Sequence, residues 1–237
     1  MADVQMSESY RAASTLALAG GFLESYTFLL HGHVFANAQT GNIALCGMAV
    51  ASRDWIAAVK YLVPIVAFSL GVFAVDWVHG KWPRSSSVHW RQGVVLTEAV
   101  LLCGCFFLRD SPQDMLANLI VSIACALQVQ TFRKVRGSAY ASTMCTGNLR
   151  SATVAWSVWR KTRQVEAKRQ CLRYVGIIGV FALGAALAVP LIAALREISI
   201  AFPIAMLIAC ACIMMRSGNP TVHSVERTHP DDNADCD

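Results

Sequence analysis

Two carboxyl side chains, Glu24 and Glu98, stand inside long apolar stretches of this sequence, and each is the only charged residue of its stretch. An ionisable group in such a setting usually faces the interior of a helix bundle, where it can exchange a proton or bind a cation. Glu24 could instead be a structural residue that ties helices together through a hydrogen bond to Tyr26, His31 or His33.

A second group of polar side chains surrounds a repeated Thr-Gly-Asn sequence. It occurs at residues 40–42 and again, 106 positions later, at residues 146–148. The surrounding segments 34–51 and 138–159 are largely apolar, yet they contain too many amides and hydroxyls for confident membrane spans. Thr or Asn beside Gly can break a helix and leave free backbone N–H groups at a positive dipole end. Unwound backbone survives at membrane depth only where protein or a watery cavity covers it.

Two arrangements fit these segments. In one, each is a re-entrant or broken helix that lines a polar site, with Asn42 and Asn148 facing it. In the other, Gly41 and Gly147 permit a tight helix turn and the amides satisfy the backbone. The first arrangement predicts a binding site for a small polar solute or ion formed by Glu24, Asn37, Gln39, Thr40, Asn42, Glu98, Gln128, Gln130, Thr143, Thr146 and Asn148.

The similarity between the two halves of the chain extends beyond Thr-Gly-Asn. Tyr, Phe, Leu and Gly at positions 61, 68, 70 and 71 recur 113 positions later, and the two Cys-x-Cys pairs are 107 positions apart. In this alignment Glu24 corresponds to Gln130, and Gln128 is nearby. The sequence therefore predicts two repeats of about 105 residues each.

The composition indicates that the bilayer is the solvent. Of the 237 residues, 55% are hydrophobic and 15% are charged, and the mean hydropathy is +0.47. A membrane-spanning helix needs about 20 mostly apolar residues. Six stretches meet or approach this requirement: 12–30, 61–75, 92–108, 115–132, 174–195 and 198–215. We therefore predict an all-α integral membrane protein with six transmembrane helices, divided into an N-terminal segment 1–11, a first three-helix repeat 12–110, a second three-helix repeat 111–216 and a disordered tail 217–237.

An odd number of spans in each half makes the second half enter the membrane from the opposite side. Inverted repeats of this kind are characteristic of secondary transporters, whose sites lie near the bilayer midplane where helices are interrupted. If each Thr-Gly-Asn segment crossed the bilayer fully, the chain would have eight spans and parallel halves.

The basic residues predict the orientation. Of the 20 Lys and Arg, 16 fall in the two termini and in the two loops that share their side of the membrane. Because short loops rich in Lys and Arg stay in the cytoplasm, both termini are predicted to be cytoplasmic. Topology and lipid head groups also account for the net charge of +5, so nucleic acid is not an expected partner.

Enzyme and cofactor signatures are absent from the sequence. It contains neither a zinc-binding His-Glu-x-x-His nor a Gly-x-Ser-x-Gly elbow. The thiols of each Cys-x-Cys pair are about 200° apart on a helix and cannot chelate one ion together. We therefore expect no catalytic residue, no metal site and no cofactor.

Two long motifs carry a family resemblance. Residues 20–28, Gly-Gly-Phe-Leu-Glu-Ser-Tyr-Thr-Phe, and the following residues 32–42 resemble the signature of the YoaK family of bacterial multi-spanning membrane proteins. The run 132–150, which ends in Thr-Gly-Asn-Leu-Arg, resembles the second signature of that family. Glu24 stands where Asp is the usual family residue, so a carboxylate is kept. The resemblance implies a bacterial cytoplasmic membrane location, but no substrate, because the function of the family is unknown.

These observations predict a transporter or channel for a small polar solute or ion, with its site between the two repeats. The alternative is a membrane assembly or interaction protein whose polar groups only hold helices together. A membrane-embedded enzyme is a weaker alternative. Six spans are few for a transporter, which is compatible with a homodimer.

Overall fold

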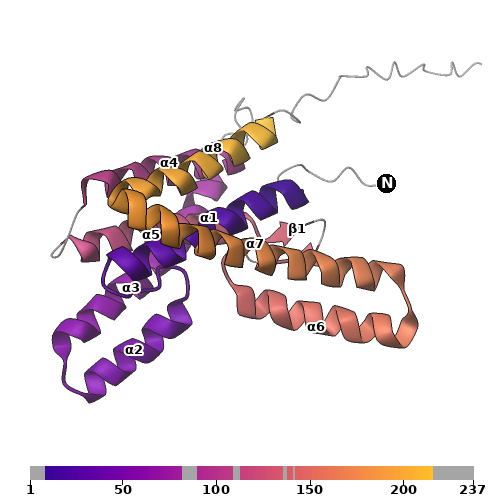
Figure 1. Cartoon of the computed structure of the whole chain (residues 1–237), viewed down its shortest axis with the longest axis horizontal. Coiled ribbons are helices and arrows are strands. Elements are labelled where there is room, and N and C mark those ends of the chain that lie inside the picture. The colour runs from indigo at the N-terminus through magenta and orange to yellow at the C-terminus, as the bar shows by residue number, and fades with distance from the viewer. Residues whose placement is uncertain (1–8, 82–89, 109–112, 136–137, 141, 216–237) are drawn as a thin grey trace, which may run out of the picture.

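The computed structural model describes residues 9–81, 90–108, 113–135, 138–140 and 142–215. The predicted tail and most of the predicted N-terminal segment lie outside these residues. The described chain is helical, apart from an antiparallel hairpin of β1 (Lys134–Val135) and β2 (Ser138–Ala139) (Figure 1). In the described ranges, the α-helices are α1 (Tyr10–Leu30), α2 (Gln39–Ala51), α3 (Trp55–Lys81), α4 (Trp90–Cys103), α5 (Asp114–Thr131), α6 (Cys145–Thr162), α7 (Val165–Leu195) and α8 (Ala201–Met215), and the 3-10 helices are η2 (Gly104–Phe107) and η3 (Arg196–Ile200).

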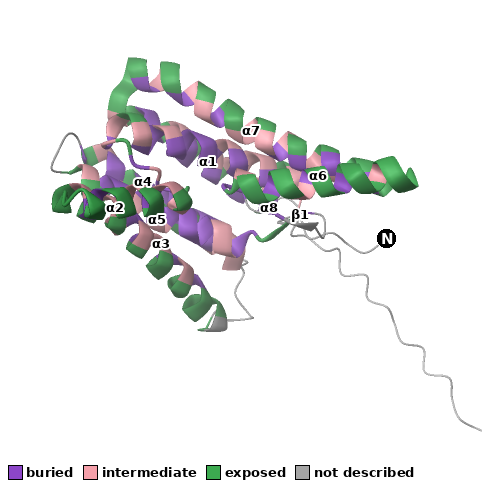
Figure 2. Cartoon of the chain, turned by 90° about the horizontal axis from the view of Figure 1, so that it is seen from below, coloured by how far each residue is buried: buried purple, intermediate pink, exposed green. Residues whose placement is uncertain are grey.

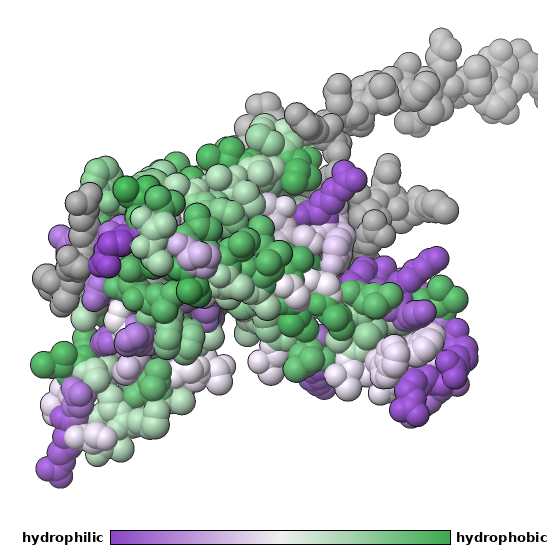
Figure 3. Space-filling view, in the orientation of Figure 1, coloured by the Kyte–Doolittle hydropathy of each residue, from purple (hydrophilic) through white to green (hydrophobic). Residues whose placement is uncertain are grey.

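Four segments of the described chain are long and apolar enough to cross a bilayer, namely Trp55–His79, Trp90–Phe107, Asp114–Thr131 and Val165–Met215. The last has 51 residues and includes α7, η3 and α8, so the four segments cover most of the predicted stretches after the first. Large apolar side chains cover much of the outer surface, such as Ile56 and Phe73, which are 84% and 69% exposed (Figure 3). In water such a surface would drive aggregation, whereas lipid tails solvate it.

The first predicted span forms α1, which is not among those four segments because glycines and Glu24 interrupt its apolar run. It lies inside the bundle and is buried along most of its length (Figure 2). Its small residues let α7 approach closely, since a Cβ atom at Gly21 would collide with the carbonyl of Phe181. Gly184 of α7 likewise faces the carbonyl of Leu18. Close approach through small residues is how helices associate without a hydrophobic driving force in lipid.

The helices of the two halves make corresponding contacts. α1 packs against α7 and α8, while α5 packs against α3 and α4. Each of the remaining helices, α2 and α6, lies beside the long helix that follows it, and α4 meets α8 between the halves. Exchanging α1–α4 for α5–α8 therefore maps each of these contacts onto its counterpart in the other half, and the α4–α8 contact onto itself.

The two Thr-Gly-Asn sequences lie at helix starts, in the same position each time. They occupy the second to fourth residues of α2 and of α6. The residues before α2 form turns and irregular backbone, and the residues before α6 include the short β1–β2 hairpin. The glycines therefore lie in N-terminal turns and do not break a longer helix.

Candidate functional site

Glu24 is buried on α1 and its carboxyl group binds the backbone immediately before α2. One carboxyl oxygen accepts the N–H of Asn37 at 2.9 Å, and the other accepts the N–H of Ala38 at 3.2 Å. Ala38 is the N-cap residue of α2 and has no side chain that could cap it. Glu24 therefore supplies the cap from another helix, and its negative charge meets the positive end of the α2 dipole. The hydrogen-bond partners predicted for Glu24, a tyrosine or a histidine, are not the ones it uses.

In the first Thr-Gly-Asn segment, amide side chains form hydrogen bonds with the backbone of the same segment. Asn42 is buried, donates to the carbonyl of Phe35 at 2.6 Å and accepts the Phe35 N–H at 3.4 Å. It also donates to the side chain of Gln39, which in turn donates to the Ala36 carbonyl. Thr40 is exposed. Asn42 and Gln39 thus satisfy local backbone, as the structural interpretation of these amides expected.

The second segment is organised around Gln128 of α5. The Gln128 side chain donates to the Ser142 hydroxyl at 2.7 Å and to the Leu16 carbonyl of α1 at 3.3 Å. Asn148 is buried, in the same helical position as Asn42, whereas Thr146 is exposed. Gln128 therefore connects α1 to the segment that leads into α6.

The segments leading into α2 and α6 meet at Gly20 of α1. The Asn37 amide donates to the Gly20 carbonyl at 3.2 Å. A Cβ atom at position 20 would lie 2.6 Å from the Thr143 methyl group and 3.7 Å from the Gln128 amide nitrogen. Only glycine leaves room for this approach. We call Gly20, Glu24, Asn37, Gln128 and Thr143 the Gly20 site.

Three side-chain oxygens of the Gly20 site are buried and have no hydrogen-bond partner among the described residues: Asn37 Oδ1, Gln128 Oε1 and Thr143 Oγ1. Buried polar atoms of this kind are uncommon in folded proteins and point to a ligand or an ordered water. Glu24 is also close enough to act electrostatically on Cys145, the first residue of α6. The site can therefore receive hydrogen-bond donors or a small cation between the starts of two helices.

Glu98 lies next to the Gly20 site but does not belong to its hydrogen-bond network. It is fully buried on α4, and neither carboxyl oxygen has a partner among the described residues. Cys125 of α5 lies near both, since it is within electrostatic range of Glu98 and of Glu24. An unpaired buried carboxylate is so costly that Glu98 must be neutral or bind a cation.

Gln130, which the sequence alignment paired with Glu24, lies elsewhere. Its amide donates to Asp76 of α3 at 2.7 Å in exposed surroundings. Gln128 takes the place comparable to Glu24, because each contacts the residue 14 positions further along the chain, Ser142 and Ala38 respectively. The signal was present in the sequence, since Leu-Glu-x-x-Thr-Phe from residue 23 aligns with Leu-Gln-x-x-Thr-Phe from residue 127.

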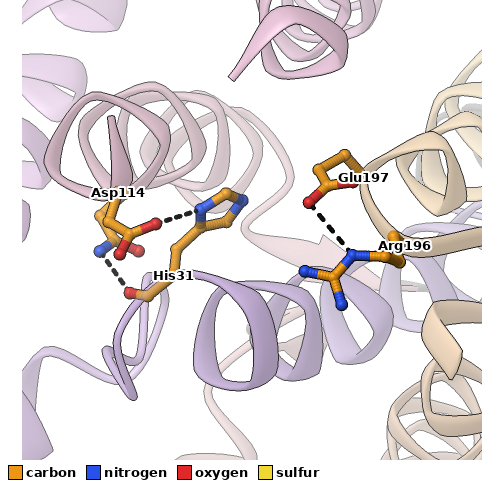
Figure 4. A network of polar contacts seen from close by, with 5 residues as sticks. His31, Asp114, Arg196 and Glu197 are labelled. Carbon is orange, nitrogen blue, oxygen red and sulfur yellow. Dashed lines mark hydrogen bonds and ion pairs between the residues drawn. The ribbon is translucent and has the colours of Figure 1, made fainter. Parts of the chain in front are cut away.

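Sequence reasoning also missed a polar cluster at the other end of α1. His31 Nδ1 lies 2.9 Å from Asp114 Oδ1, and the Asn118 amide donates to the His31 carbonyl at 2.9 Å (Figure 4). Arg196 and Glu197 of η3 form an ion pair at 3.6 Å on the far side of the His31 ring (Figure 4). This cluster connects the end of α1 to the start of α5.

The comparisons with known proteins agree with this membrane architecture. Residues 12–213 match the family described as "Protein of unknown function (DUF1275)". The chain is 28% identical over 183 residues to the UPF0700 transmembrane protein YoaK of Bacillus subtilis (strain 168), covering 73% of this chain and 79% of that protein. No solved structure matches the chain significantly. With its apolar helices and a family match over most of its length, the chain belongs to the DUF1275 family of transmembrane proteins of unknown function.

Proposed function

We propose that this protein is a transporter or channel for a small polar solute or ion, and that the Gly20 site binds that solute. The observation that supports this most directly is the meeting of two helix-start segments at Gly20, where three buried oxygens have no partner in the part of the chain that the structure describes. A solute that donates hydrogen bonds would satisfy these oxygens. Secondary transporters bind their substrates at comparable points, where discontinuous helices begin near the bilayer midplane.

The proposal includes an inverted arrangement of α1–α4 and α5–α8, each with three spans and one half-helix. Its support is the set of corresponding helix contacts and the courses of α2 and α6, which start near the centre and run in different directions (Figure 1). An odd number of spans per half places the halves antiparallel. Both termini would then lie in the bacterial cytoplasm, on the side that collects 16 of the 20 Lys and Arg.

In this mechanism, the binding of a proton or a cation to Glu24 is coupled to the position of α2. As a carboxylate it holds the N–H groups of Asn37 and Ala38 and complements the α2 dipole. A proton or a cation on Glu24 weakens both interactions. The start of α2 is then free to move or to present its N–H groups to the solute, which links ion binding to solute access.

A membrane assembly protein is the second candidate function. The observation that favours it is the closure of the Asn42 and Gln39 side chains on local backbone, which leaves these two amides little capacity for a solute. In that case the polar groups only connect helices.

Flux through purified protein in liposomes distinguishes the two functions. The full chain is reconstituted, and fluxes of protons, alkali cations, ammonium and small neutral polar solutes are compared with those in protein-free liposomes. The transport function predicts flux of at least one of these solutes, lost in Glu24→Gln and in Thr143→Val.

Gln130→Ala is the matched control, because Gln130 is a half-buried amide that bonds Asp76 outside the Gly20 site. It should transport like the unmodified protein. Folded protein that carries none of these solutes would refute the transport function and leave the assembly function.

A further inference from the structure

A cavity of about 470 Å³ lies at one end of the bundle, between the last turns of α3 and α5 and the first turn of α4. Its lining includes Asp76 and His79 of α3, Trp90 and Arg91 of α4, and Arg133 and Lys134 at the start of the hairpin. The His79 ring packs against the Trp90 ring in a tilted arrangement, with centroids 4.4 Å apart, and so joins α3 to α4 at the cavity wall. None of these six residues belongs to the Gly20 site.

The cavity is electropositive. Arg91, Arg133 and Lys134 bring three permanent positive charges to it, and Asp76 is its one acidic lining residue. The Asp76 carboxylate already accepts a hydrogen bond from Gln130 at 2.7 Å. Arg133 and Lys134 are exposed, and no ion pair joins either of them to a carboxylate in the described part of the chain.

The surroundings of the cavity are those of a membrane–water boundary. Trp77, on the same helical end, is 57% exposed, and the Lys81 ammonium lies 3.8 Å from its ring centroid. Trp and basic residues gather at the head-group level of membrane proteins. Val78 is also exposed, so an acyl chain can lie along α3 beside the opening.

We propose that this cavity binds a phosphate group, supplied by the head group of an anionic glycerophospholipid. Arginine guanidinium groups and a lysine ammonium suit phosphate oxygens, which Arg can bind in a bidentate manner. Basic pockets between transmembrane helices bind anionic head groups in this way. Asp76 and Gln130 at the same wall can hydrogen-bond head-group hydroxyls, which favours phosphatidylglycerol over a head group without hydroxyls. Free inorganic phosphate presents the same oxygens and is the other source of this chemistry.

Native mass spectrometry of the full chain in detergent tests the proposal, with phosphatidylglycerol, phosphatidylcholine or inorganic phosphate added. We expect phosphatidylglycerol to bind at least tenfold more tightly than phosphatidylcholine. The double variant Arg133→Gln/Lys134→Gln should lose most of this preference. Asp76→Asn should strengthen binding, because it removes the acidic group from the wall.

Arg160→Gln/Lys161→Gln is the matched control, since it removes two exposed charges from the far end of α6. It should bind phosphatidylglycerol like the unmodified protein. Displacement of the lipid by millimolar inorganic phosphate would identify free phosphate as the occupant of the same site. Equal binding of the two lipids, or equal loss in both double variants, would overturn the proposal.

Discussion

Replacing the Glu24 carboxyl group should lower the free energy of unfolding, by more in Glu24→Ala than in Glu24→Gln. Glu24→Ala leaves the N–H groups of Asn37 and Ala38 without their acceptor. An unsatisfied buried donor costs about 1–3 kcal/mol, and hydrogen bonds in membrane proteins average about 0.6 kcal/mol. Because Ala38 is itself exposed and its N–H can be rehydrated, we expect a total loss near the lower end, about 2–3 kcal/mol.

Glu24→Gln should be intermediate. The amide has one acceptor oxygen, so it can satisfy one of the two N–H groups and directs its own donor at the other. The expected loss is therefore about half that of Glu24→Ala, on the order of 1 kcal/mol. A near-isosteric amide therefore cannot fully replace a side chain that accepts two N–H bonds.

The native cysteines allow the thermal unfolding of these variants to be measured. Cys105, Cys125 and Cys210 are buried and become reactive to a thiol-specific fluorophore when the bundle unfolds. For a chain of this size, 1 kcal/mol corresponds to roughly 2–4 °C in the midpoint temperature. At one heating rate, we expect the midpoint temperature to fall by about 4–12 °C for Glu24→Ala and by about half as much for Glu24→Gln. Gln130→Ala should stay close to the unmodified protein. Equal midpoints for all three variants would show that the Glu24 cap contributes nothing to stability.

Three further predictions concern packing, the second carboxyl and topology. Gly184→Ala should lower the unfolding midpoint by several degrees, because its Cβ would meet the Leu18 carbonyl. Gly179→Ala, with no neighbouring atom within 4 Å, should leave the midpoint unchanged, and similar midpoints for the two variants would contradict the close contact of α1 and α7. Glu98→Leu should keep or raise the unfolding midpoint, since the Glu98 carboxyl makes no hydrogen bond to a described residue. The same variant should abolish ion-dependent flux, and a fully active Glu98→Leu protein would exclude Glu98 from transport. A reporter fused after Asp237 should be active only in the cytoplasm, and activity outside the cell would reverse the topology.

The sequence by itself determined the membrane class, the helical stretches and the position of the polar segments. These properties follow from local composition, because a spanning helix must be long and apolar whatever it contacts. The six predicted stretches lie in helices or the 3-10 turns next to them, apart from the end residues Leu108 and Phe132. Glu24 and the Thr-Gly-Asn segments were recognisable because polar groups are costly in an apolar run.

Only the tertiary structure decided which polar side chains meet. Gln128 and Gln130 are two positions apart and so point about 200° apart around α5, which places one at Gly20 and the other at Asp76. Composition does not reveal this rotation, which depends on how α5 packs against its neighbours. The approach of Asn37 and Thr143 to Gly20 likewise joins segments remote in sequence, and the absence of a Cβ atom at Gly20 leaves room for Thr143. The capping of α2 by Glu24 is also a tertiary contact.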